Sequence, residues 1–195
     1  MYICIKGGIV LEKKDSILTI IEIDIKKVAW QSLWMTIVFS LLGLIIYILV
    51  YKEFEINFSL LGIFLFLIGY LLLIVLHEAF HLIGFWAFGK VPWNKMDYGV
   101  NLKLGVAYAT TSIPIPNKSM KKALLLPFWT TGIIPMLFGY GIESPLLVLL
   151  GAWLVAGAAG DFAMYRELRK YPNDILIKDD PALPVLYVIE ENRSA

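Results

Sequence analysis

The sequence predicts an all-α membrane protein, a bundle of four transmembrane helices with small strand elements at its cytosolic face. Two observations predict this class. The 195 residues are 59% hydrophobic and only 17% charged, and the mean hydropathy of +0.74 is far above that of soluble globular proteins. The apolar residues also gather in four segments that are each long enough to cross a bilayer core of about 30 Å. A chain of this length predicts a single domain over residues 1–195.

The first two predicted spans are the most apolar. Residues 30–51 are 22 residues without a charge, which suits one membrane crossing. Residues 58–88 contain no Lys, Arg or Asp, and as a straight helix they would be about 46 Å long. We therefore expect the second helix to be tilted, broken near Gly84, or continued into the cytosolic interface.

The third and fourth spans contain helix-modifying residues. Residues 123–140 include Pro127 and Pro135, so we expect kinks, with neighbouring helices covering the carbonyls that proline leaves free. Residues 145–165 form the fourth span. Their stretch of glycines and alanines between 151 and 160 predicts close packing against another helix.

The cationic residues predict the orientation of the bundle. Sixteen of the 17 lysines and arginines lie before the first span, between the second and third, or after the fourth, and only Lys52 lies on the other side. By the positive-inside rule both termini are expected in the cytosol. Lys13, Lys14 and Asp15 interrupt the apolar pattern of a cleavable signal peptide, so we expect the first span to direct insertion.

Three segments outside the spans have strand-like patterns. Residues 17–25 alternate isoleucine with acidic residues, and residues 183–189 predict a second strand. Residues 99–111 alternate in the same way and follow the second span, at the cytosolic mouth. An exposed edge there would bind an extended peptide substrate by strand addition. A plain interfacial hairpin packed on the bundle explains the same pattern equally well.

The motif that carries chemistry lies inside the second span, where ionisable residues are costly. It reads His77-Glu78-Ala79-Phe80-His81 and contains the only two histidines of the chain. Histidines four apart share one face of a helix and can bind one metal ion. Glu78 can reach a water in the open position of the metal and take its proton. The motif predicts a Zn²⁺ site with one ion per chain, since ionisable residues within a membrane default to a functional role.

A third ligand is expected from the fourth span. Asp161 lies about 24 Å along that helix, at a depth that matches the two histidines, and an isolated carboxylate there would be costly without a cation. The alternative is a carboxylate at the helix end that faces water or pairs with Arg166. Glu167 is a weaker candidate ligand, and Tyr165 is either an interfacial residue or a support for the site.

These residues resemble those of known metalloproteases. A membrane helix with His77-Glu78-x-x-His81, followed by an Asp on a later helix, resembles the site-2 protease class of intramembrane metalloproteases. With Gly160-Asp161 and the charged tail, the chain more closely resembles a bacterial and archaeal family of putative zincin peptidases, over about residues 60–181. Site-2 proteases usually have Gly after the ligand Asp, whereas Phe162 follows here, and there is no PDZ-like insertion.

The resemblance implies a zinc-dependent endopeptidase of a prokaryotic cell membrane, in which zinc-activated water attacks a peptide bond and Glu78 is the general base. The alternatives are a non-catalytic divalent-metal-binding membrane protein, such as a transporter or sensor, and an inactive protease-like scaffold. A transport path normally needs polar groups through the bilayer, and the first and third spans have no ionisable residue. The net charge of +1 without a basic cluster argues against nucleic acid, and the single Cys4 excludes a CxxC metal site.

Overall fold

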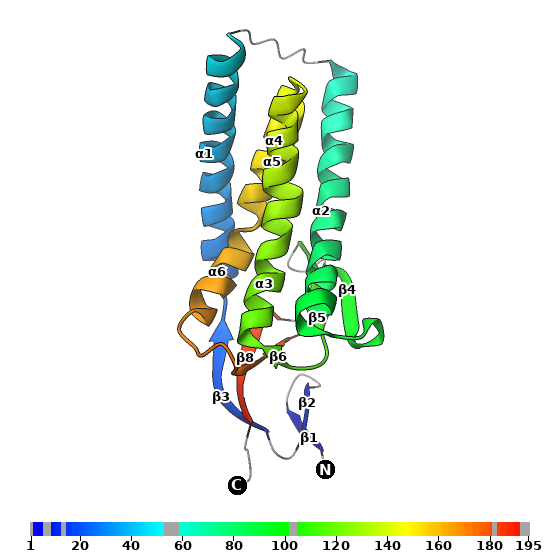
Figure 1. Ribbon diagram of the computed structural model, residues 1–195, viewed down its shortest axis with the longest axis vertical. Coiled ribbons are helices and arrows are strands. Elements are labelled where there is room, and N and C mark those ends of the chain that lie inside the picture. The colour runs from blue at the N-terminus through cyan, green and yellow to red at the C-terminus, as the bar shows by residue number, and fades with distance from the viewer. Residues whose placement is uncertain are drawn as a thin grey trace.

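The computed structural model describes residues 2–5, 9–12, 15–52, 59–101, 105–180 and 183–191. Long helices run side by side along the molecule, and the strands gather at one end of the bundle (Figure 1). Within the described residues, four helical segments are long and apolar enough to cross a membrane: Ile25–Tyr51, Leu60–Gly89, Asn117–Gly141 and Pro145–Leu168. The prediction of four long apolar helices with small strand elements at one end is confirmed, whereas the all-α class is too narrow, because the described strands form a four-stranded sheet and two hairpins.

The first two spans are continuous helices. α1 (Ile25–Tyr51) begins five residues before the predicted span, because the Asp24 side chain accepts the Lys27 N–H and caps the first turn. α2 (Leu60–Gly89) passes through Gly84 without a break and ends at Lys90, whose φ of 54° is left-handed. The predicted alternative of a break near Gly84 is therefore wrong. The predicted start at Phe58 lies outside the described residues.

The third span is interrupted at the first of its two prolines. α3 (Asn117–Pro127) is followed by a widened π-helical turn, Phe128–Ile133, and then by α4 (Ile134–Gly141). Because Pro127 has no N–H, the helical hydrogen bond to the Ala123 carbonyl cannot form. The π-helical turn follows directly at Phe128, and Pro135 lies in the first turn of α4; the kinks expected at these prolines stay predictions.

The fourth span consists of two helices, α5 (Pro145–Gly157) and α6 (Ala159–Leu168), which meet at Ala158. The span predicted over 145–165 is confirmed within the apolar helical segment Pro145–Leu168, and the turn at Ala158 divides it into two helices. Close packing is confirmed at Gly151, where an added Cβ would lie 2.6 Å from the Met136 Cβ on α4. Gly157 has open space and does not take part in this packing, and a Cβ at Gly160 would lie 3.8 Å from Val28 of α1, which is an ordinary contact distance.

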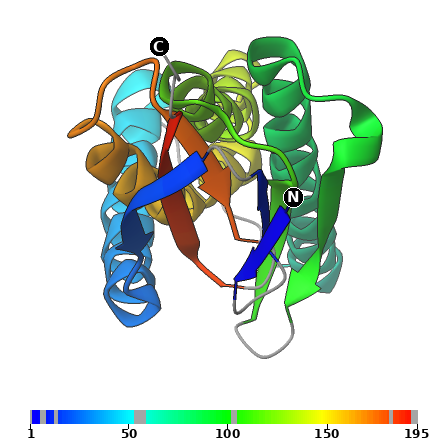
Figure 2. The same cartoon turned by 90° about the horizontal axis from the view of Figure 1, so that it is seen from below.

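The described strands form three antiparallel sheets at one end of the bundle, which Figure 2 shows from below. A four-stranded sheet has the order β3-β8-β7-β6, and β1-β2 and β4-β5 are hairpins. Their bounds are β1 Tyr2–Ile5, β2 Ile9–Glu12, β3 Asp15–Glu22, β4 Met96–Asn101, β5 Val106–Thr111, β6 Ile115–Pro116, β7 Leu176–Asp179 and β8 Val185–Glu191. A short 3₁₀ turn, Trp93–Lys95, joins α2 to β4.

The strand predictions agree in kind but differ at their ends. The strand predicted over 17–25 ends at Glu22, because the following residues cap and begin α1. The tail strand predicted over 183–189 is β8 and starts two residues later. The segment 99–111 forms part of the β4-β5 hairpin, and its residues 102–104 lie outside the described part of the chain.

A buried apolar cluster joins the sheet to the lower ends of the helices. Phe85 of α2, Met120 of α3 and Leu168 of α6 pack there against Ile177 and Val188 of the sheet. Burial of large apolar side chains is the main stabilising contribution in such a cluster. It fixes α2, α3 and α6 relative to one another directly below the histidine motif.

Candidate metal centre

α2 brings the three polar residues of the motif onto one face of the helix. His77 and His81 are buried, with 7% and 5% of their surfaces exposed, and their ring centroids are 5.0 Å apart. Glu78 is half-buried beside them. Ligand atoms of His77, Glu78 and His81 all lie within 4.8 Å of one another, so the group is placed to bind a metal ion.

The His81 ring is oriented by a carbonyl that proline leaves free. Its Nδ1 lies 3.1 Å from the Ala123 oxygen, which is the carbonyl that would accept the missing N–H of Pro127 in a regular helix. A carbonyl only accepts, so Nδ1 of the neutral ring carries the proton and donates it. The lone pair of Nε2 is thereby directed away from α3. The predicted covering of a proline-freed carbonyl by a neighbouring helix is confirmed at Ala123.

The His77 ring is oriented by Thr131 in the π-helical turn. The Thr131 hydroxyl donates to the Pro127 carbonyl at 2.8 Å, and its oxygen lies 3.2 Å from the His77 Nδ1. Because the hydroxyl proton is used on Pro127, the oxygen accepts from the histidine. In the neutral ring, Nδ1–H is therefore held by Thr131 and Nε2 is left unprotonated. Pro127 thus supports both rings.

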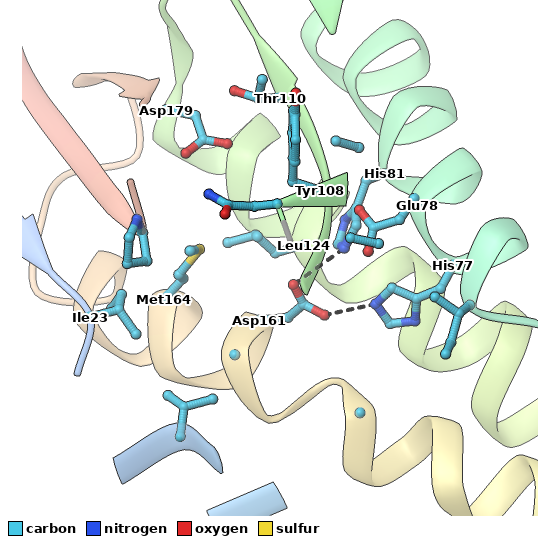
Figure 3. Close-up of a pocket in the computed structure, with 18 of the residues that line it drawn as sticks. Ile23, His77, Glu78, His81, Tyr108, Thr110, Leu124, Asp161, Met164 and Asp179 are labelled. Carbon is cyan, nitrogen blue, oxygen red and sulfur yellow. Dashed lines mark hydrogen bonds and ion pairs between the residues drawn. The ribbon is translucent and has the colours of Figure 1, made fainter. Parts of the chain in front are cut away.

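Asp161 lies between the two histidines. Its Oδ2 is 3.1 Å from the His77 Nε2 and its Oδ1 is 3.2 Å from the His81 Nε2, as Figure 3 shows. The side chain is 14% exposed. Because α5 stops at Ala158, Asp161 falls in the first turn of a new helix, where backbone N–H groups favour a negative charge. Among the described residues, the Asp161 carboxylate therefore lies against the two Nε2 atoms, and it forms no ion pair with Arg166.

The other candidates from the fourth span lie elsewhere. Glu167 pairs with Lys170 on the surface, and neither Glu167 nor Tyr165 lines the cavity around the histidines. Sequence reasoning missed Thr131 as a partner of the motif, because a lone Thr in an apolar span carries no signal of its own. The role of Ala123 could be predicted in part, because it lies four residues before a proline and its carbonyl therefore has no helical N–H partner.

The histidines open into a cavity of about 450 Å³ between the bundle and the strands. Its walls come from α1, α2, α3, α5, α6, β5 and the loops after β4 and β7. Outside the helices, Asp179 at the end of β7 lines the same cavity (Figure 3). Burial raises the pKa of the Asp179 carboxyl to about 7, although the adjacent Thr110 hydroxyl acts in the opposite direction.

A comparison with protein families identifies the chain. The sequence profile of a family described as putative zincin peptidase matches residues 70–176, more than half of the chain. The chain belongs to this family. The matched residues include the motif on α2 and Asp161 on α6, and the family implies zinc. No curated protein and no solved structure matches the chain.

Proposed function

We propose that the protein is a zinc-dependent endopeptidase that cleaves peptide bonds within or beside the membrane, with zinc bound by His77, His81 and Asp161. The observation that carries this proposal is the convergence of both Nε2 atoms on one carboxylate, with both Nδ1 atoms already engaged. A hydrogen bond donated by Nδ1–H keeps the proton on that nitrogen and leaves the Nε2 lone pair free to bind a metal ion.

The donor atoms fit a zinc ion in type and spacing. Two imidazoles and a carboxylate are a usual set for a catalytic zinc site, which keeps one position open. In a tetrahedral site with bonds of about 2.0–2.1 Å, neighbouring ligand atoms are about 3.3 Å apart. The nitrogen–oxygen separations of 3.1 and 3.2 Å are close to that value. The spacing therefore supports a shared metal.

The position of Glu78 supports a role as general base. Glu78 is next to His77 in sequence and lines the cavity from the same helix, so its carboxylate can accept a proton from a water held among the ligands. The same carboxyl group can then return the proton to the leaving amine. Zinc, when bound, would supply Lewis-acid chemistry that makes this water acidic enough to lose its proton at neutral pH.

The β4-β5 hairpin offers a place for the substrate chain. β5 supplies Ala107, Tyr108, Ala109 and Thr110 to the cavity lining, and β4 is its only strand partner in the described part of the chain. An extended peptide added to the other edge of β5 would lie in the cavity beside the histidines. Residues 99–111 are accordingly proposed to hold the substrate as an added strand.

The membrane setting is proposed from the four apolar helices. Their exposed faces are rich in large apolar residues, for example Leu49, Leu60 and Val75, which suits contact with lipid chains. With both termini in the cytosol, the cavity would open at the cytosolic interface, because the motif and strand residues of β5 and β7 line the same cavity. In its HExxH helix and the Asp161 that follows on a later helix, the chain resembles site-2 proteases.

The proposal is tested by Glu78→Gln in protein purified in detergent. This substitution keeps the size and polarity of the side chain but removes its basicity, so zinc content should remain normal while cleavage of membrane-protein or peptide substrates falls at least ~10²-fold. Glu167→Gln is the matched control, because Glu167 lies outside the cavity lining. Normal cleavage by Glu78→Gln would remove Glu78 from the mechanism. Zinc binding without cleavage by the wild type would favour a metal-binding scaffold or transporter.

A further inference from the structure

A second carboxylate faces the cavity from the side opposite α2. Figure 3 shows Asp179 beside Thr110, across the cavity from His77. Asp179 is the last residue of β7 and Thr110 lies on β5, the strand proposed to hold the substrate. A peptide chain added along β5 would therefore pass close to the Asp179 carboxyl group.

The ionisable groups of this cavity are predominantly acidic. Apart from the histidines and two tyrosines, Tyr70 and Tyr108, the ionisable residues of the described lining are Glu78, Asp161, Asp179 and Asp180, and none of the described lining residues is Lys or Arg. A zinc ion carries two positive charges, which match the charges of Asp161 and Glu78. Two carboxylates, Asp179 and Asp180, are then left to set the charge that the substrate encounters.

The two remaining carboxylates have different surroundings. Asp180 accepts the Leu183 N–H at 2.9 Å and the Tyr187 hydroxyl at 2.8 Å, so it has a structural role. Asp179 forms no ion pair with a described residue. Lys178 precedes it on β7, where successive side chains point to opposite faces, and Lys178 is absent from the cavity lining.

Asp179 is half-buried, and the loss of contact with water makes its charged form costly, which raises the pKa of the Asp179 carboxyl to about 7. A positive group that entered the cavity beside it would remove much of that cost. Hydrogen bonds between oppositely charged partners are also stronger than neutral ones. The wall opposite the histidines therefore has the properties of a subsite for a cation.

We propose that Asp179 is a specificity-determining residue that selects substrates with an ammonium or guanidinium group near the bond to be cleaved. This inference rests on the proposed peptidase function, because it names the substrate class of the same site. The positive group has two possible sources, namely a lysine or arginine side chain or the free amino terminus of a peptide. Both would be bound by the same carboxylate.

The experiment compares peptides that differ in a single charge. One set has lysine, norleucine or glutamate at each position flanking the cleaved bond, and a second set differs only in acetylation of the amino terminus. Wild type should cleave the lysine peptide or the free-amine peptide at least about tenfold more efficiently than its neutral counterpart. Asp179→Asn should lose this preference and still cleave the neutral peptide. Asp179→Lys should favour the glutamate peptide.

Two further variants serve as the control and distinguish failure of this inference from failure of the proposed peptidase function. Asp174→Asn changes an exposed carboxylate outside the cavity lining and should keep the wild-type preference. Binding of the same peptides to Glu78→Gln protein is measured by fluorescence anisotropy, so that charge selection is read without cleavage. An unchanged preference in Asp179→Asn would overturn the inference. Absence of cleavage by wild type, with binding that still depends on Asp179, would overturn the proposed function alone.

Discussion

Gly84 holds α2 and α3 close enough for His81 to reach its carbonyl partner. An added Cβ at Gly84 would lie 2.7 Å from the Ala123 Cα and 2.9 Å from its Cβ, whereas ordinary contacts begin at 3.4 Å. The atoms in the way belong to a helix backbone and to a short side chain, so rotation of a flexible group cannot relieve the overlap. Gly84→Ala must therefore move α2 and α3 apart.

The size of the effect follows from these distances. Relief of the overlap requires a separation of about 0.7 Å, and if the His81 Nδ1 and the Ala123 oxygen separate equally, their 3.1 Å contact lengthens to about 3.8 Å, beyond a hydrogen bond. Overpacking of this kind costs about 1–3 kcal/mol of stability. Loss of a hydrogen bond that orients a metal ligand typically lowers metal affinity about 10–100-fold.

The assay is a zinc titration in detergent with thermal unfolding of the metal-free protein. Gly141→Ala is the matched control, because a Cβ there meets nothing within 4 Å, and both properties should remain at wild-type values. Gly84→Ala should unfold at a lower temperature and bind zinc more weakly. If Gly84→Ala loses stability but binds zinc as tightly as wild type, the support of His81 by Ala123 has no part in the metal site.

Three further predictions concern the support of the site, its pH dependence and the topology. Thr131→Val should lower zinc affinity about 10–100-fold by removing the acceptor of the His77 Nδ1–H, whereas Thr131→Ser should keep it; equal affinities would contradict the assigned tautomer. Folding raises the pKa of the Asp179 carboxyl from 3.8 to about 7, so the folded state of wild type loses stability as the pH rises from about 4 to 7. Asp179→Asn does not titrate, and its melting temperature should rise relative to that of wild type over this range. A difference in melting temperature that does not change with pH would contradict this. Cysteines at positions 118 and 141, both exposed, should react with impermeant reagents from the cytosolic and outer sides respectively in a Cys4→Ala background, and the reverse pattern would overturn the orientation.

The sequence alone predicted the features that depend on the spacing of residues along the chain. Histidines four apart on a continuous apolar helix have to share a face, and the structure places both in one buried group with Glu78. The lengths of the apolar segments predicted the number of spans, and the missing N–H of Pro127 predicted that the helical hydrogen bonding would be interrupted there. These features are local, so a single sequence contains the information needed to predict them.

Features that depend on tertiary contacts were predicted less well. The division of the fourth span at Ala158 has no proline to announce it, and Gly157, within the small-residue stretch, has open space around it. Thr131 and Asp179 acquire their roles only because the π-helical turn and β7 bring them to the cavity. Residue type alone does not indicate which polar side chain will face a site on a different element.

The central claim is that His77, His81 and Asp161 hold a single zinc ion, and metal content tests it most directly. Wild-type protein purified without chelators should contain about one zinc per chain, and His77→Ala and His81→Ala should lose it. Asp161→Ala should bind zinc more weakly in a titration of the folded protein, whereas Glu167→Ala should bind it normally. Full zinc content in both histidine variants would contradict the metal site itself. Wild-type affinity in Asp161→Ala together with weakened binding in Glu167→Ala would show that Glu167, not Asp161, is the third ligand.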